Sequence, residues 1–315
     1  MRPDTAPPVA ALPVTHRSSV TADQIDHLGH MNVRFYAVNA LAGTAAVVGG
    51  LPGWPSGAHV VHDVYTRHHR EQLEGTALEV RSAVLGATPS ALRLHHELVA
   101  SDSGELAATF VHGVSPVGDD GAPRPLSDAV MEAAASRATA QPSYAAPRTV
   151  SLGADLARSA PSLELLRARG LAMRKERRVD PDECDERGAY RVDLAPMLTW
   201  GGEPVGGDAG GGARETPDGK LMAWASMETR VQLCRLPVVG TRIQSFGAGV
   251  AVHDKVTHRV HWAYDLDTGA LLTAFEAVSL AFDIRARRPM PIPDDLRAFE
   301  LGRLQPDLAP PLAAP

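Results

Sequence analysis

The sequence predicts an α+β fold of two tandem units, each an antiparallel sheet wrapped around a central helix. Three observations support this prediction. The chain has 315 residues, about twice the length of a common domain. Its two halves repeat a faint pattern of residues, and both contain segments in which apolar and polar residues alternate.

The internal repeat begins with an acidic turn. Residues 20–29 (VTADQIDHLG) and 179–188 (VDPDECDERG) share a Val, two Asp and a Gly in the same order. Two further pairs of segments, later in each half, align with each other if the second half contains a short insertion. The glycine-rich residues 201–212 have the composition of a loop that accommodates an insertion at little cost. The later matches are residues 74–76 with 239–241 and residues 103–110 with 268–275.

Each half is expected to run in the same order: a short strand, an Asp-rich turn, a helix and three or four strands. Residues 76–84 and 92–99 alternate as half-buried antiparallel strands do. The DSG and DTG sequences at 102–104 and 267–269 are typical of hairpin turns. The first strands are expected around residues 14–21 and 175–179, and the helices around residues 31–48 and 190–200.

The first helix is expected to bury one mostly apolar face against its sheet, because apolar side chains recur there at helical spacing. This expected face consists of Phe35, Val38, Leu41, Ala42 and Ala45.

Composition shifts suggest the domain bounds. A Pro- and Gly-rich stretch separates the halves, and it continues into an Ala-rich segment, residues 127–138, that predicts a helix. The Pro- and Ala-rich end of the chain predicts disorder. The expected bounds are residues 1–120 for the first unit, 121–165 for the linker, 166–300 for the second unit and 301–315 for the tail.

Composition also excludes several function classes. Hydrophobic residues make up 44% and charged residues 22%, as in soluble globular proteins. A net charge of −6 argues against nucleic acid as a partner. The weakly polar run 37–51 is too short to cross a membrane, and no secretory signal is visible. The two cysteines, Cys184 and Cys234, show no zinc or disulfide spacing, so a cytoplasmic protein is expected.

One motif suggests a family. Residues 26–32 read DHLGHMN and resemble the Asp-x-x-Gly-His-x-Asn segment of hotdog-fold thioesterases, which include 4-hydroxybenzoyl-CoA thioesterase and the plant acyl-carrier-protein thioesterases. The resemblance implies a double-hotdog protein that hydrolyses a thioester of CoA or of acyl-carrier protein without a cofactor. Because two units already form the pair that single-domain relatives form by dimerising, a homodimer of this chain is possible but not required.

The motif has the parts that thioester hydrolysis needs. Such a reaction requires a base or nucleophile beside the carbonyl carbon and donors aimed at the carbonyl oxygen. Asp26 is expected to be the base or nucleophile, because the resemblance places the catalytic Asp three residues before Gly29. Gly29 lets a substrate approach the main chain closely. His30 is expected to orient water or polarise the carbonyl, and Asn32 to position either.

Further residues are assigned to substrate binding. Gly29, His30 and Met31 form the expected oxyanion and substrate-binding turn at the start of the helix. Arg34 is a candidate contact for CoA phosphates, as are Arg67 and Arg70. Many relatives carry an acidic residue on the central helix that is missing here. Asp63 in the first half, or Glu228 at the matching place in the second, is a candidate to replace it from the second shell or across the domains.

Simpler roles exist for the same residues. Asp26 can cap the helix, and the recurrence of Asp185 in the second half favours that interpretation. A histidine at a helix start is often a surface residue, and Asn32 can be structural. In the second half, Ala189 stands in place of His30 and Arg191 in place of Asn32. The second unit is therefore expected to supply fold and one wall of a shared pocket, which leaves one asymmetric active site.

A metal site is not expected, although histidines are frequent in the first half: His59, His62, His68, His69, His95 and His96. Neighbouring histidines on a strand point to opposite faces, so no single face gathers three ligands. Cys184 matches Ile25 and is expected to pack in the core. Two other functions remain open: a non-catalytic acyl-CoA-binding protein and a hotdog hydratase or dehydratase, whose Asp-x-Asn-Pro-x-His segment is absent.

Overall fold

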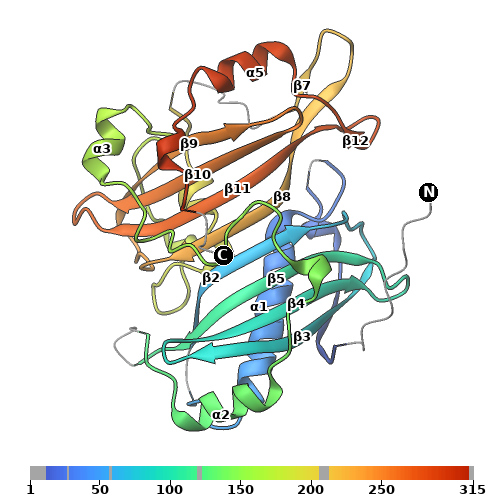
Figure 1. Cartoon of the computed structure of the whole chain (residues 1–315), viewed down its shortest axis with the longest axis vertical. Coiled ribbons are helices and arrows are strands. Elements are labelled where there is room, and N and C mark those ends of the chain that lie inside the picture. The colour runs from blue at the N-terminus through green and yellow to red at the C-terminus, as the bar shows by residue number, and fades with distance from the viewer. Residues whose placement is uncertain (1–11, 27, 57–58, 119–122, 206–212, 312–315) are drawn as a thin grey trace. The chain divides into compact units, whose positions relative to one another are not determined.

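A computed structural model describes residues 12–26, 28–56, 59–118, 123–205 and 213–311. The chain forms two compact units. The first contains residues up to 60 together with residues 69–145, and the second contains residues 61–68 together with residues 146 onwards (Figure 1). One short strand segment of the first half of the chain thus belongs to the second unit.

The first unit is an antiparallel sheet with one long helix across a face (Figure 1). The strand order is β1-β3-β4-β5, and the helix α1 contacts all four strands. Buried Tyr36 and Ala40 of the helix pack with Leu78, Leu98 and Phe110 of the sheet. The bounds are β1 (Val14–Ser19), α1 (Val33–Gly49), β3 (Ala77–Thr88), β4 (Ala91–Ala100) and β5 (Leu106–Pro116).

The buried face of α1 differs from the expected one. The helix buries Tyr36, Asn39, Ala40, Gly43, Thr44 and Val48, whereas Val38 is 37% exposed and Ala45 is exposed. The expectation was wrong because apolar spacing alone assumed an apolar sheet surface. Polar side chains of this helix instead find hydrogen-bond partners beneath it, as Asn39 does with the Ser18 hydroxyl.

A chain of hydrogen bonds runs beneath α1. The Thr44 hydroxyl lies 2.9 Å from His96 Nε2 and 2.7 Å from His112 Nδ1, and the Ser82 hydroxyl lies 2.7 Å from His96 Nδ1. Both ring nitrogens of this buried imidazole therefore have partners. Burial, and then the neighbouring His112 and His95, hold the pKa of His96 well below its usual value, so the ring is neutral.

The second unit repeats this sheet with extra strands. Its order is β2-β8-β11-β10-β9-β6, and β7 and β12 pair with β8 and β11. Strand β2 lies at the edge of this order and pairs antiparallel with β8. The paired residues run from Asp63 opposite Gln232 to Arg67 opposite Glu228. The bounds are β2 (His59–His68), β6 (Arg177–Arg178), β7 (Arg214–Glu215), β8 (Leu221–Leu233), β9 (Arg242–Val252), β10 (Val256–Asp265), β11 (Leu271–Asp283) and β12 (Arg288–Pro289).

The helix expected around residues 190–200 is much reduced. A single 3-10 turn (Val192–Leu194) and the short helix α4 (Met197–Trp200) stand in its place. Pro196 accounts for the break, since it has no N–H to donate to a preceding carbonyl, although Ala195 before it keeps helical geometry. Leu198 of α4 still packs on the sheet, against a core that includes Val231, Ala263 and Phe275.

Main-chain hydrogen bonds confirm the internal repeat. Asp26 N donates to His30 O at 2.9 Å, and Asp185 N donates to Ala189 O at 2.8 Å. Gly29 and Gly188, with φ of 84° and 77°, close the two turns. These left-handed conformations explain why glycine recurs in both halves.

The linker and the tail make defined contacts. In the linker, α2 (Asp128–Arg137) begins at the Ser127 cap, as expected, and packs on β3 of the first unit, and α3 (Leu163–Ala168) lies in the second unit. The helix α5 (Asp294–Leu301) ends the second unit, and the described part of the tail, which was expected to be disordered, contains a 3-10 turn (Pro306–Leu308). Burial of Leu308 against the second core accounts for this difference.

No helix in the described ranges is both long and apolar enough to span a membrane.

Candidate active site

The motif forms a tight turn that leads into α1. Asp26 Oδ1 accepts a hydrogen bond from Leu28 N at 2.8 Å, and Gly29 N donates to Asp26 O at 3.0 Å. The Asp26 side chain therefore stabilises the turn and does not cap the helix. Its second oxygen, Oδ2, is directed toward His30. His27 of the motif lies outside the described residues.

His30 lies between two carboxylates. Its Nδ1 is 3.5 Å from Asp26 Oδ2, and its Nε2 is 3.5 Å from Glu71 Oε1. The imidazole is 15% exposed, and the Glu71 carboxylate is 39% exposed. These separations are long for hydrogen bonds, and catalytic contacts often shorten only when substrate binds.

Glu71 is the functional candidate that sequence reasoning missed. Two hydrogen bonds hold the main chain on either side of it: the Tyr36 hydroxyl donates to Arg70 O at 3.1 Å, and Met31 N donates to Gln72 O at 2.7 Å. Burial raises the pKa of Tyr36 to about 12, so this donor keeps its proton. The only signal in the sequence was the missing helix carboxylate, which required a substitute from another element.

The His30 main-chain N–H is a candidate oxyanion donor. In the second unit the equivalent Ala189 N donates to Asp185 Oδ1 at 3.0 Å. In the first unit the Asp26 carboxylate turns toward the His30 ring instead, and within the described ranges no acceptor lies in reach of His30 N. A main-chain donor at the start of the helix thus has no partner among the described residues, and a donor of this kind can stabilise a developing oxyanion.

The other motif residues have structural contacts. Asn32 is the N-cap of α1, because its Oδ1 accepts from Arg34 N at 3.0 Å. The Met31 side chain is fully buried in the first core, and its main-chain N–H donates to Gln72 O at 2.7 Å, so Met31 has a structural role. The Arg34 guanidinium lies over the Phe35 ring, 5.4 Å from its centroid.

Asp63 and Glu228 are engaged within the second unit. Asp63 pairs through both oxygens with Arg230, at 3.0 and 2.8 Å. Glu228, 3% exposed, accepts from the main-chain N–H groups of Arg148 and Thr149 at 2.7 and 3.0 Å, and also from the Tyr65 hydroxyl. Both carboxylates thus hold together β2, β8 and the linker. The carboxylate beside His30 is Glu71. Arg67, another candidate phosphate contact, donates to Ala146 O at 3.0 Å.

The second unit lacks the parts of this site. Asp185 Oδ1 accepts from two main-chain N–H groups, and Ala189 offers no ring. Leu236 packs at the place that corresponds to Glu71. Cys184 packs against the same core, as expected, and burial raises the pKa of its thiol.

The described residues contain no group of three or more His, Cys, Asp or Glu side chains that could hold a metal ion. His95 and His96 point to opposite faces of β4, as their adjacent positions predicted. His95 contacts Glu97, whereas His96 contacts Thr44 beneath α1.

Comparison with known proteins bears on the first unit's sequence and on the fold of the chain. The thioesterase-like superfamily model matches residues 20–134, most of the first unit. No curated protein matches the sequence significantly. An acyl-ACP thioesterase from Bacteroides thetaiotaomicron is 7% identical, with a TM-score of 0.56 over 84% of this chain and 96% of its own. A 12:0-ACP thioesterase from Umbellularia californica is 10% identical, with a TM-score of 0.58 over 84% of this chain and 93% of its own.

The chain therefore has the fold of the hotdog thioesterases, and its residues 20–134 are similar to the thioesterase-like superfamily. The chain as a whole has the double-hotdog fold.

Proposed function

We propose that the protein hydrolyses acyl-CoA thioesters to a free acid and CoA at a single site in the first unit. The observation that carries the proposal is the position of His30 between Asp26 and Glu71, at a turn whose His30 N–H is unpaired within the described residues. The match of residues 20–134 to the thioesterase-like superfamily supports it.

The proposed reaction uses each group once. The substrate carbonyl oxygen accepts from the His30 main-chain N–H, which stabilises the negative charge that develops there. His30 Nε2, on the Glu71 side, takes a proton from water as the water oxygen bonds to the carbonyl carbon. The C–S bond then breaks, and the thiolate of CoA takes the proton back from the imidazolium.

Asp26 and Glu71 act on the charge of this imidazole. Asp26 already accepts from Leu28 N through one oxygen, so its other oxygen orients His30 and stabilises the imidazolium. The alternative, in which Asp26 attacks the carbonyl directly, gives an anhydride. Repeated turnover in ¹⁸O-labelled water tests for this route, because label enters the Asp26 carboxylate only when water attacks the Asp26 carbonyl of the anhydride.

The experiment measures thiol release from a panel of acyl-CoAs. We expect His30→Ala to lower kcat by about 100-fold or more and Asp26→Asn and Glu71→Gln to lower it by about 10-fold or more. Asp185→Asn is the matched control, since it removes the equivalent turn carboxylate from the unit without a histidine.

Full activity in both Asp26→Asn and His30→Ala would contradict the proposal. Tight acyl-CoA binding without turnover would identify a binding protein instead. The same panel presented on acyl-carrier protein decides between the two thiol carriers, and the structural similarity to two ACP thioesterases is the reason to include it.

A further inference from the structure

The loop that carries Glu71 is held by two buried side chains. The Tyr36 hydroxyl donates to Arg70 O at 3.1 Å, and the Gln72 side-chain amide donates to the same oxygen at 3.3 Å. A carbonyl oxygen has two lone pairs and can accept both bonds. Tyr36 and Gln72 are 3% and 4% exposed, so both bonds are made away from solvent. These two side chains are referred to as the loop clamp.

The loop clamp fixes the main chain beside Glu71 rather than its carboxylate. That carboxylate is 39% exposed, and its Oε1 lies 3.5 Å from His30 Nε2. The neighbouring Arg70 guanidinium pairs with Glu105 at 2.8 Å. A partly exposed glutamate samples several rotamers. Its position beside the imidazole therefore depends on how firmly the main chain that carries it is fixed.

Tyr36 also connects this loop to the motif turn. It lies in the first turn of α1 and packs in the first core. Burial raises the pKa of its phenol, a hydrogen bond with the Gln72 main chain lowers it in part, and the negative charge of Asp26 raises it further. The hydroxyl thus interacts with the loop that carries Glu71 and with a carboxylate of the turn that carries His30.

The second unit forms the same loop from main-chain bonds alone. Met31 N donates to Gln72 O at 2.7 Å in the first unit, and Tyr190 N donates to Pro237 O at 2.9 Å in the second. These matching bonds align the two loops residue by residue. The loop clamp is therefore not needed to form the loop.

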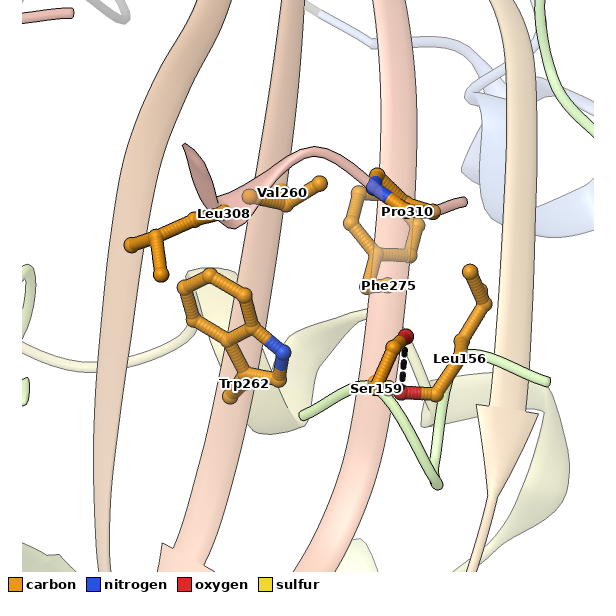
Figure 2. Close-up of a pocket in the computed structure, with 8 residues that line it drawn as sticks. Leu156, Ser159, Val260, Trp262, Phe275, Leu308 and Pro310 are labelled. Atoms are coloured by element: carbon orange, nitrogen blue, oxygen red, sulfur yellow. Dashed lines mark hydrogen bonds between the residues drawn. The ribbon is translucent and has the colours of Figure 1, made fainter. Parts of the chain in front are cut away.

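The second unit has neither the loop clamp nor the residues of the proposed site. The hollow on its sheet is lined by side chains such as Leu156, Trp262 and Leu308, and none of the described lining residues is acidic, basic or a thiol (Figure 2). The loop clamp therefore accompanies the catalytic residues and not the loop. Ala195, Pro237 and Leu236 occupy the places of Tyr36, Gln72 and Glu71 in the repeat.

We propose that Tyr36 is a positioning residue of the active site, which holds Glu71 beside His30 through its bond to Arg70 O. This inference rests on the proposed function, because it requires that Glu71 assists His30. Tyr36 is buried and does not touch the substrate. Removal of its hydroxyl should therefore lower kcat and leave KM unchanged.

The test is a double-substitution cycle, measured as thiol release by the full-length protein from the acyl-CoA that the wild type hydrolyses fastest. Tyr36→Phe should lower kcat about fivefold, but by less than about twofold in the Glu71→Gln background, because coupled residues are not additive. Gln72→Met removes the other donor of the loop clamp and should show the same dependence on Glu71.

Tyr190→Phe is the matched control. Tyr190 is a 1% exposed tyrosine of the second unit, and its hydroxyl donates to Leu194 O at 3.3 Å. Its substitution removes a comparable buried hydrogen bond and should leave kcat unchanged. A general loss of stability would instead affect both tyrosine variants alike.

Hydrogen exchange of the amides in residues 69–75 tests the loop clamp without reference to activity. Tyr36→Phe should speed exchange there by about fivefold, the effect of one net hydrogen bond, and Tyr190→Phe should not. Unchanged exchange in Tyr36→Phe would overturn the proposal even if the protein hydrolysed no thioester.

The outcomes separate this proposal from the proposed function. A wild-type kcat in Tyr36→Phe, together with a loss in Glu71→Gln, would overturn the positioning role alone. An equal loss from Tyr36→Phe in both backgrounds would also overturn it, since the hydroxyl would then not act through Glu71. A wild-type kcat in Glu71→Gln would contradict the role of that carboxylate in the proposed reaction, and the positioning role with it.

Discussion

Equivalent histidines in the two sheets differ in their hydrogen bonding. His96 lies opposite Ser82 and Phe110 on its neighbouring strands, and His261 lies opposite Gly247 and Phe275. Ser82, which bonds His96, is thus replaced by Gly247 at the equivalent position beside His261. Within the described ranges both ring nitrogens of His261 lack partners, although the residue is 3% exposed. A buried imidazole without partners destabilises the fold, whereas a fully bonded one does not.

This difference predicts opposite effects of the same substitution. His261→Leu should raise the free energy of unfolding by about 1 kcal/mol, because it removes an unpaired polar group from a core. His96→Leu should lower it by about 2 kcal/mol or more, because it removes two buried hydrogen bonds, those of the ring with Ser82 and with Thr44. Urea unfolding of the two variants measures this, and a loss of stability in both would contradict it.

The same two histidines predict a pH dependence of stability. Burial holds the pKa of each ring well below its usual value near 6.5. Below about pH 6.5 these two histidines are therefore protonated in the unfolded chain and still neutral in the folded chain. The stability that the neutral rings contribute is present above about pH 6.5 and is lost as the pH falls below it. The free energy of unfolding should decline as the pH is lowered from 7.5 to about 5. His261→Leu should make this decline shallower, and an unchanged slope would disprove the assignment.

The motif turn shows how one element serves two purposes. The same hydrogen-bond pattern and a left-handed glycine occur in both units, so Asp26 and Gly29 are required by the turn itself. In the first unit alone, His30 and Glu71 are added to this turn, and the proposed catalysis depends on them.

A glycine pair separates the structural purpose from the catalytic one. Gly29→Ala and Gly188→Ala should each lower stability by about 1 to 2 kcal/mol, because alanine is strained at their positive φ. Thiol release should fall with Gly29→Ala alone, since only that turn aims an N–H at the proposed carbonyl site. Equal activity of the two variants would argue against an active site at this turn.

At the scale of the whole molecule, the chain order does not follow the two halves of the repeat. Strand β2 comes from the first half of the sequence but pairs with β8 in the second unit, where Asp63 bonds the 2% exposed guanidinium of Arg230. Separating the halves would leave that guanidinium buried without its carboxylate, and a broken buried ion pair is costly.

A fragment of residues 146–315 is therefore expected not to fold stably, although it contains nearly all of the second unit. In the full chain, Asp63→Asn should lower the unfolding free energy by about 3 kcal/mol. Circular dichroism and chemical unfolding test both, and a cooperatively folding fragment with full-chain stability would refute the account.

Sequence by itself determined the repeat, the antiparallel strands, the first helix and the motif turn, because these depend on local periodicity and on glycine's conformational freedom. Tertiary structure decided which face of α1 is buried, the break of the second helix, the transfer of β2 and the carboxylate beside His30. Asn39 and Thr44 are polar in sequence and buried in structure only because Ser18 and His96 meet them. Glu71 reaches His30 from far along the chain, and residue spacing carries no information about such long-range contacts.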